Sequence, residues 1–325
     1  CATKARYCVP FVAVDTVWGV ATVVFKERAP VPLTRHLPDV LWLAKEFAPP
    51  SPAAPPAAVG PTASRPQPLS QHLQVQCLGR FQVLVDGVLV DARDFGRAKS
   101  RELLAILIAA AGRPVTGEEL WEALWPGAEP ALARNRLHVT LSGLRSVVDP
   151  AGRASETHIR RDGPRYVLDP RSSVSVDLWR FRERLAQAAA AVSQRRPEEE
   201  VVAALEAVIG LYEGDPFGRE FQDGWGEAVA SRGRREVLWA LEHLVALQCR
   251  SGDRHAAVAA LRRAEEIDPL REDLRRQLMQ LLTTLGRPAE SAECYRRLEE
   301  TLATTLGTAP AGATIRLHEA LQASL

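Results

Sequence analysis

Apolar residues in the middle of the chain recur at the spacing of amphipathic helices. Over Arg101–Ala111 the apolar stripe consists of Leu103, Leu104, Leu107, Ile108 and Ala111. Positions three and four residues apart share one face of a helix, so this stripe predicts a helix with one buried side. Gly112 follows the stripe, and a glycine at that place is typical of a helix end.

Two further helices are predicted from the residues at their ends. Thr116 and Glu119 form a capping box, and the helix that they open stops at Pro126. A third helix is predicted over Pro130–Val148, because proline suits the first turn of a helix and an apolar stripe follows it.

Strand patterns lie on both sides of these helices. Leu73–Cys77 and Phe81–Val85 precede them. Thr157–Arg161 and Arg165–Leu168 follow them as a hairpin around an Asp-Gly-Pro turn. The order strands, three helices, hairpin is that of a winged helix-turn-helix, whose third helix enters the DNA major groove. We therefore expect an α+β winged-helix DNA-binding domain over residues 73–170.

The pattern from Asp177 onward is helical almost throughout and contains a repeat. Gly252 and Gly286 each end one helix and precede another, and they lie 34 residues apart (286 − 252). That is the period of tetratricopeptide repeats, in which helix pairs stack to bury their apolar faces. Residues 177–325 are expected to form an all-α tetratricopeptide-like domain.

The first block of the chain has a different residue pattern. Strands are predicted over Cys8–Val14 and Trp18–Lys26, with a helix near His36–Phe47, which makes residues 1–48 a short α/β N-terminal remnant. A membrane span over this apolar stretch is disfavoured by Asp15 and by the β-branched content, so no membrane partner is expected. Residues 49–72 are rich in proline and alanine and predict a linker.

The composition mainly excludes classes of site and of function. The 325 residues carry a net charge of +1, so any nucleic-acid affinity has to come from a local patch. The five cysteines and seven histidines are scattered, without metal-ligand spacing or a disulfide framework. No catalytic set stands at an informative spacing either. We expect a cytoplasmic protein that is not an enzyme and that uses no metal or cofactor.

The predicted third helix has a face suited to reading DNA. Opposite its leucine stripe lie four candidate base-contacting residues: Asn135, His138, Val139 and Ser142. Polar side chains can read base edges and valine can contact a thymine methyl group. The edges of this face carry candidate phosphate contacts at Arg134, Arg136 and Arg145, and no acidic residue occurs between Ala131 and Val148. A solvated surface helix is the alternative, but it would usually mix glutamate with lysine.

Two smaller basic groups complete the candidate phosphate contacts. One is at the start of the first helix and comprises Arg97, Lys99 and Arg101. The other is on the hairpin and comprises Arg160, Arg161 and Arg165. Together with the third helix they would form one basic surface in an otherwise neutral protein.

From Leu73 to Leu321 the chain resembles the Streptomyces antibiotic regulatory protein (SARP) family of activators. The resemblance is carried by Leu78-Gly79-Arg80-Phe81, Lys99…Glu102-Leu103-Leu104, Leu120…Leu124-Trp125-Pro126, Leu141-Ser142-Gly143-Leu144-Arg145, Arg165-Tyr166-Val167-Leu168, Val176-Asp177…Phe181, Asp268-Pro269-Leu270-Arg271-Glu272 and Tyr295…Leu298. It implies an OmpR-type winged helix joined to a bacterial transcriptional activator domain. It also implies binding to direct repeats in promoter DNA and contact with RNA polymerase.

The first block is similar to the last strands of a GAF sensor domain at Tyr7–Phe11 and Trp18–Val20, with Leu33–Phe47 as its closing helix. In that interpretation the chain is a piece of a longer protein. The alternative is a small degenerate appendage.

These patterns together predict a sequence-specific activator that binds double-stranded promoter DNA. Its helical domain would supply protein contacts and self-association, giving a homo-oligomer on DNA. Residues 73–170 are expected to bind DNA without the helical domain. The rival hypothesis is a tetratricopeptide adaptor whose winged helix binds protein rather than DNA.

Overall fold

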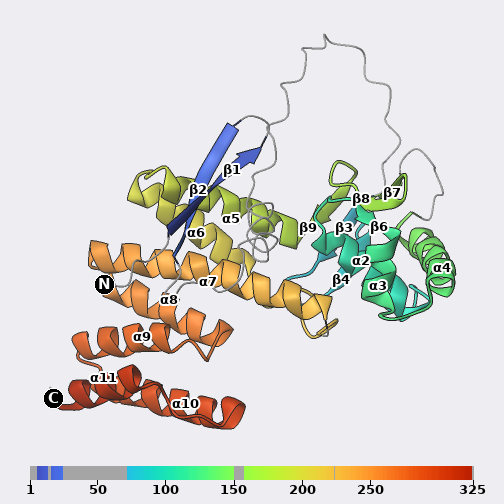
Figure 1. Cartoon of the computed structure of the whole chain (residues 1–325). Coiled ribbons are helices and arrows are strands. Elements are labelled where there is room, and N and C mark those ends of the chain that lie inside the picture. The colour runs from blue at the N-terminus through green and yellow to red at the C-terminus, as the bar shows by residue number, and fades with distance from the viewer. Residues whose placement is uncertain (1–5, 14–15, 25–71, 150–156, 223, 324–325) are drawn as a thin grey trace. The chain divides into compact units, whose positions relative to one another are not determined.

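The computed structural model describes residues 6–13, 16–24, 72–149, 157–222 and 224–323 (Figure 1). The chain divides into two compact units, Cys1–Ser64 and Arg65–Leu325. In the first unit, β1 (Arg6–Ala13) pairs antiparallel with β2 (Thr16–Val24), as the sequence predicted for this stretch. The helix predicted near His36–Phe47 lies outside the described residues, and so does the α/β character that depends on it. Residues 49–71 of the predicted linker lie outside them as well.

The second unit begins with a four-stranded sheet in the order β5-β4-β3-β9. Its strands are β3 (Leu73–Gln76), β4 (Gln82–Val85), β5 (Val88–Leu89) and β9 (Val174–Val176). β3 runs antiparallel to β4 and parallel to β9. The alternate residues Leu73, Val75 and Val83 are fully buried, as expected for a sheet with one face on the core. β9 was not predicted, because three residues are too short for a recognisable alternation.

Three helices follow: α2 (Ala98–Ala109), α3 (Gly117–Leu124) and α4 (Pro130–Val148). The capping box is confirmed, since the Thr116 hydroxyl accepts from the Glu119 amide at 3.1 Å and Glu119 accepts from the Thr116 amide at 2.7 Å. The α4 N-terminus is capped by Glu129, whose carboxylate accepts from the amides of Ala131 and Leu132. A three-stranded sheet, β6-β8-β7, combines β6 (Val115–Thr116) with the predicted hairpin of β7 (Ile159–Asp162) and β8 (Arg165–Leu168).

Seven described helices complete the unit. They are α5 (Asp177–Ser193), α6 (Glu198–Leu211), α7 (Trp225–Ser251), α8 (Arg254–Ile267), α9 (Glu272–Thr284), α10 (Pro288–Leu306) and α11 (Gly312–Ala323). Each packs against the next along the chain, and α9 also packs against α11. Gly252 and Gly286 adopt φ of +87° and +71° in the two turns predicted from the repeat, a conformation that favours glycine. None of the described helices is long and apolar enough to cross a membrane.

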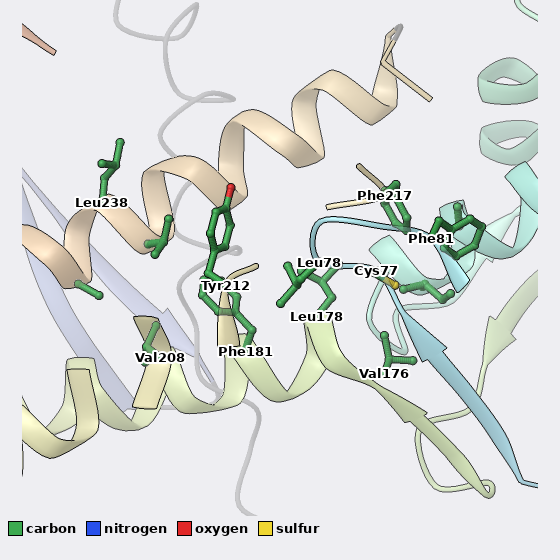
Figure 2. Close-up of a cluster of buried hydrophobic side chains, with 14 of the residues drawn as sticks. Cys77, Leu78, Phe81, Val176, Leu178, Phe181, Val208, Tyr212, Phe217 and Leu238 are labelled. Carbon is green, nitrogen blue, oxygen red and sulfur yellow. The ribbon is translucent and has the colours of Figure 1, made fainter. Parts of the chain in front are cut away.

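The sheet and the helices share one continuous core within the second unit (Figure 2). Phe217, in the loop between α6 and α7, packs edge-on against Phe81 at a ring-centroid distance of 5.4 Å. Phe217 is also within ring-contact distance of Phe221 and Trp225. The sequence offered no signal for this cluster, because Phe81 precedes the other three rings by more than a hundred residues.

A half-buried carboxylate stabilises the joint between the four-stranded sheet and the helices that follow it. Asp177 begins α5, and its oxygens accept from the backbone amides of Cys77 at 2.7 and 2.8 Å and of Leu78 at 3.0 Å. It also accepts from Leu178 in its own helix. One side chain therefore satisfies amide donors at the end of β3 and at the start of α5, which would otherwise be costly to bury.

Candidate nucleic-acid interface

The helix α4 presents one buried and one exposed face. Its buried side consists of Ala133, Leu137, Thr140, Leu141, Leu144 and Val148. On the other side Asn135, His138, Val139 and Ser142 are all exposed. The sequence-predicted base-contacting set is therefore on one accessible surface, with its leucine stripe fixed in the core.

The start of α2 lies beside the middle of α4. The Ser100 hydroxyl is 3.5 Å from the carbonyl oxygen of Thr140, and a Cβ at Gly143 would be 3.4 Å from the same hydroxyl. Arg97 and Lys99 precede Ser100 by three residues and one residue, so the backbone that carries them lies at this end of α2. Arg97 has no acidic partner among the described residues, whereas the Lys99 ammonium pairs with Glu102 at 2.6 Å.

The hairpin lies on the other side of α4. Arg145 donates from Nη2 to the carbonyl oxygen of Ile159 at 3.1 Å, which ties the helix to β7. Arg161, which donates to the Gly163 carbonyl, and Arg165 are exposed near the hairpin turn. Arg160 is exposed as well, although its guanidinium is 3.5 Å from the Asp169 carboxylate.

Two predicted phosphate contacts have partly buried side chains that bind groups of the protein itself. Arg101 donates to Glu220 at 2.9 Å and to the carbonyl of Phe81, and its guanidinium carbon is 4.6 Å from the centre of the Phe81 ring. Only 13% of its side chain is exposed, so Arg101 links α2 to the α6–α7 loop instead of facing solvent. Arg145 is likewise half-buried, and its Nε has no partner among the described residues.

The remaining arginines of α4 differ in their surroundings. Arg134 is exposed, and its guanidinium carbon is 5.9 Å from the centre of the Trp121 ring of α3. Arg136 is exposed and has no acidic partner within the described part of the chain. An unpaired guanidinium beside an exposed polar face can bind an anion without first breaking an ion pair.

One exposed residue of this face was missed. Leu132 is 47% exposed and lies seven positions before Val139, which is two helical turns. The spacing is visible in the sequence, but leucine on a helix is normally assigned to the buried side.

A buried polar pair joins the end of α4 to the start of β7. Asp149 caps α4, its Oδ1 accepts from the His158 amide at 3.0 Å, and the two side chains are 3.8 Å apart. His158 Nε2 and Asp149 Oδ2 have no hydrogen-bond partner among the described residues. Burial, aided by the charge of His72, lowers the pKa of His158 from its usual value near 6.5, against the opposing effect of Asp149 and Asp86.

We expect the free energy of unfolding to fall as the pH drops below about 6.5, because the unfolded chain takes up a proton at His158 more readily than the folded one. The stabilisation is complete above that pH and is lost as the pH falls towards the lower pKa of the folded state. Urea midpoints at about pH 7.5 and about pH 5.5 measure it. The urea midpoint of His158→Gln should fall less between these two pH values than that of the parent. The exposed control His138→Gln should show the same fall as the parent. An equal drop in all three proteins would contradict this assignment.

No group of three or more metal-ligating side chains occurs among the described residues. The chemistry available at the α4 surface is therefore hydrogen bonding, apolar contact and cationic attraction.

Comparison with known proteins points to transcriptional regulators of one type. Residues 176–322 match the family model for the bacterial transcriptional activator domain. The chain is 30% identical over 251 residues to the transcriptional regulatory protein EmbR of Mycobacterium tuberculosis, covering 76% of the chain and 62% of EmbR. The regulatory protein AfsR of Streptomyces coelicolor is 28% identical over 66% of the chain and 21% of AfsR. Over these residues the chain is similar to the SARP-type transcriptional regulators.

A solved structure of this SARP type agrees in fold. The structure of M. tuberculosis EmbR in complex with a low affinity phosphopeptide matches with a TM-score of 0.57 and 28% identity, over 78% of the chain and 66% of that protein. The sequence-predicted resemblance to the SARP family is thereby confirmed, and so is a predominantly helical chain with a small sheet region before the helices. The chain spans less than two thirds of the length of these EmbR relatives.

Proposed function

We propose that this chain is a cytoplasmic transcriptional activator in which residues 73–170 act as a winged helix on double-stranded promoter DNA. The observation that carries the proposal is the exposed face of α4, which has no acidic residue and lies between the basic start of α2 and the hairpin. A helix of this kind fits the major groove, while the hairpin would contact an adjacent groove or phosphates.

The proposed contacts divide into two classes. Asn135, His138, Val139 and Ser142 would contact base edges, since they project from the centre of the exposed face. Phosphates would be bound by Arg97, Lys99, Arg134, Arg136, Arg160, Arg161 and Arg165. Arg101 is left out because its side chain is largely buried against Phe81 and Glu220, and Arg145 is assigned to holding the hairpin.

The tetratricopeptide-like helices are proposed to supply the protein contacts. The match of residues 176–322 to an activator domain supports contact with the transcription machinery, including RNA polymerase. We propose that two copies bind direct repeats side by side, which would make the chain a homo-oligomer on DNA.

The test begins with duplexes that the full chain selects from a randomised pool. Asn135→Ala should weaken binding to a selected duplex by about 1–3 kcal/mol and leave a scrambled duplex unaffected. Arg136→Ala should weaken binding to both duplexes. It should also make the fall of log affinity with log salt less steep by about one. Arg254→Ala serves as the control, since it removes the same charge from an exposed position at the start of α8.

Two outcomes would overturn the proposal. One is failure of the full chain to enrich any duplex. The other is binding that does not weaken with salt, because phosphate contacts release counterions and make that dependence unavoidable. Either result would favour the adaptor hypothesis, in which the module binds protein.

A further inference from the structure

Two exposed large apolar side chains lie on one face of α4. Among the described residues five large hydrophobic side chains are exposed, and two of them are Leu132 and Val139 at 47% and 50%. Single exposed aliphatic residues are ordinary on protein surfaces. These two are seven residues apart on one helix, however, and therefore point in nearly the same direction, about 10 Å apart along the axis.

The surroundings of Leu132 favour contact with bases over contact with phosphate. A free helix N-terminus offers amide donors to an anion, but here Glu129 already accepts from the amides of Ala131 at 3.1 Å and Leu132 at 2.9 Å. Its carboxylate also repels a phosphate at that end. The first turn of α4 is thus held in a fixed position and offers the groove an apolar side chain.

Thymine is the base that presents an apolar group, its C5-methyl, in the major groove. Successive bases of one strand are about 3.4 Å apart along the axis, so 10 Å corresponds to about three steps. With the axis of α4 along the groove, two methyl groups at that separation would meet Leu132 and Val139 together.

We propose that Leu132 and Val139 read the methyl groups of two thymines about three base steps apart, and so determine part of the DNA sequence that this chain prefers. The inference rests on the proposed function, because it assumes that α4 enters the major groove. It extends the base-contacting set to Leu132 and assigns the two aliphatic residues to methyl groups, while Asn135 between them is left to a hydrogen-bonding base edge.

The experiment removes the methyl groups from the DNA and leaves the protein intact. In a duplex selected by the full chain, each thymine is replaced in turn by uracil, which has the same hydrogen-bonding edge and lacks only the methyl group. We expect affinity to fall about fourfold at two positions, the effect of losing one buried methyl contact at each. Uracil at every other thymine should leave affinity unchanged.

Protein variants then assign each methyl group. Leu132→Ala should lose the uracil effect at one of the two positions, and Val139→Ala should lose it at the other. Leu89→Ala, at an exposed leucine of β5, should keep both effects. The proposal is overturned if the parent binds its selected duplex but responds to no uracil, or if the responses persist in both α4 variants. Those results leave DNA binding itself intact, whereas failure to select any duplex would remove both proposals.

Discussion

A fragment limited to residues 73–170 is expected not to fold as an independent, cooperative domain. Cutting after residue 170 removes β9, which pairs in parallel with β3 through Leu73 and Val75. It also removes Asp177, leaving the buried amides of Cys77 and Leu78 without their carboxylate. Each hydrogen bond to a charged group contributes about 1.5–3 kcal/mol, against a total domain stability of about 5–15 kcal/mol.

The apolar losses point in the same direction. Leu78 and Phe81 are at most 4% exposed in the intact chain, and Phe81 packs on Phe217 and Phe221 from the α6–α7 loop. In the fragment these side chains would face water. The sequence had led to the opposite expectation, that this segment binds DNA alone, because the shared core is invisible in the pattern of either half.

Urea unfolding of the fragment and of residues 72–325 measures the difference. The longer chain should unfold cooperatively, and the fragment should lack a folded baseline and bind a dye that recognises exposed apolar surface. A cooperative fragment with the DNA affinity of the longer chain would show that the joint contributes little, and the winged-helix proposal would stand without it.

Phe217→Ala is expected to be the most destabilising single substitution in the joint, at about 3–5 kcal/mol. The ring is 1% exposed and lies within contact distance of Phe81, Phe221 and Trp225. Truncation would leave a cavity between the sheet and α7, lined by three other aromatic rings that cannot all move into it.

Denaturant midpoints at constant slope measure this loss. Leu89→Ala is the control, since that side chain is 57% exposed and its truncation should change stability by no more than about 0.5 kcal/mol. The double variant of Phe81 and Phe217 tests the contact itself. The double variant should lose less free energy of unfolding than the two single variants together. The difference should be about 0.5–1.5 kcal/mol, the usual coupling of an edge-on ring pair. A loss below about 1 kcal/mol for Phe217→Ala would contradict the role assigned to this ring.

Local sequence signals determined the elements that carry the candidate interface. The stripe of Leu137, Leu141 and Leu144 placed the base-contacting set on the opposite face of α4, and the structure exposes that set. The capping box at Thr116 and the left-handed turns at Gly252 and Gly286 were likewise readable from neighbouring residues. Periodicity and capping depend on residues within a few positions of each other, so one sequence suffices to recognise them.

Only the tertiary structure decided which charges are free and which are used. Arg97 and Arg101 are four residues apart in one basic group, yet Arg101 is bound to Glu220, which is 119 positions away. The burial of His158 beside Asp149 and the packing of Phe81 on Phe217 depend equally on distant segments. The energy of an ion pair or a ring contact depends on distance in space, and that distance is fixed only when the sheet, the hairpin and the helices pack into one core.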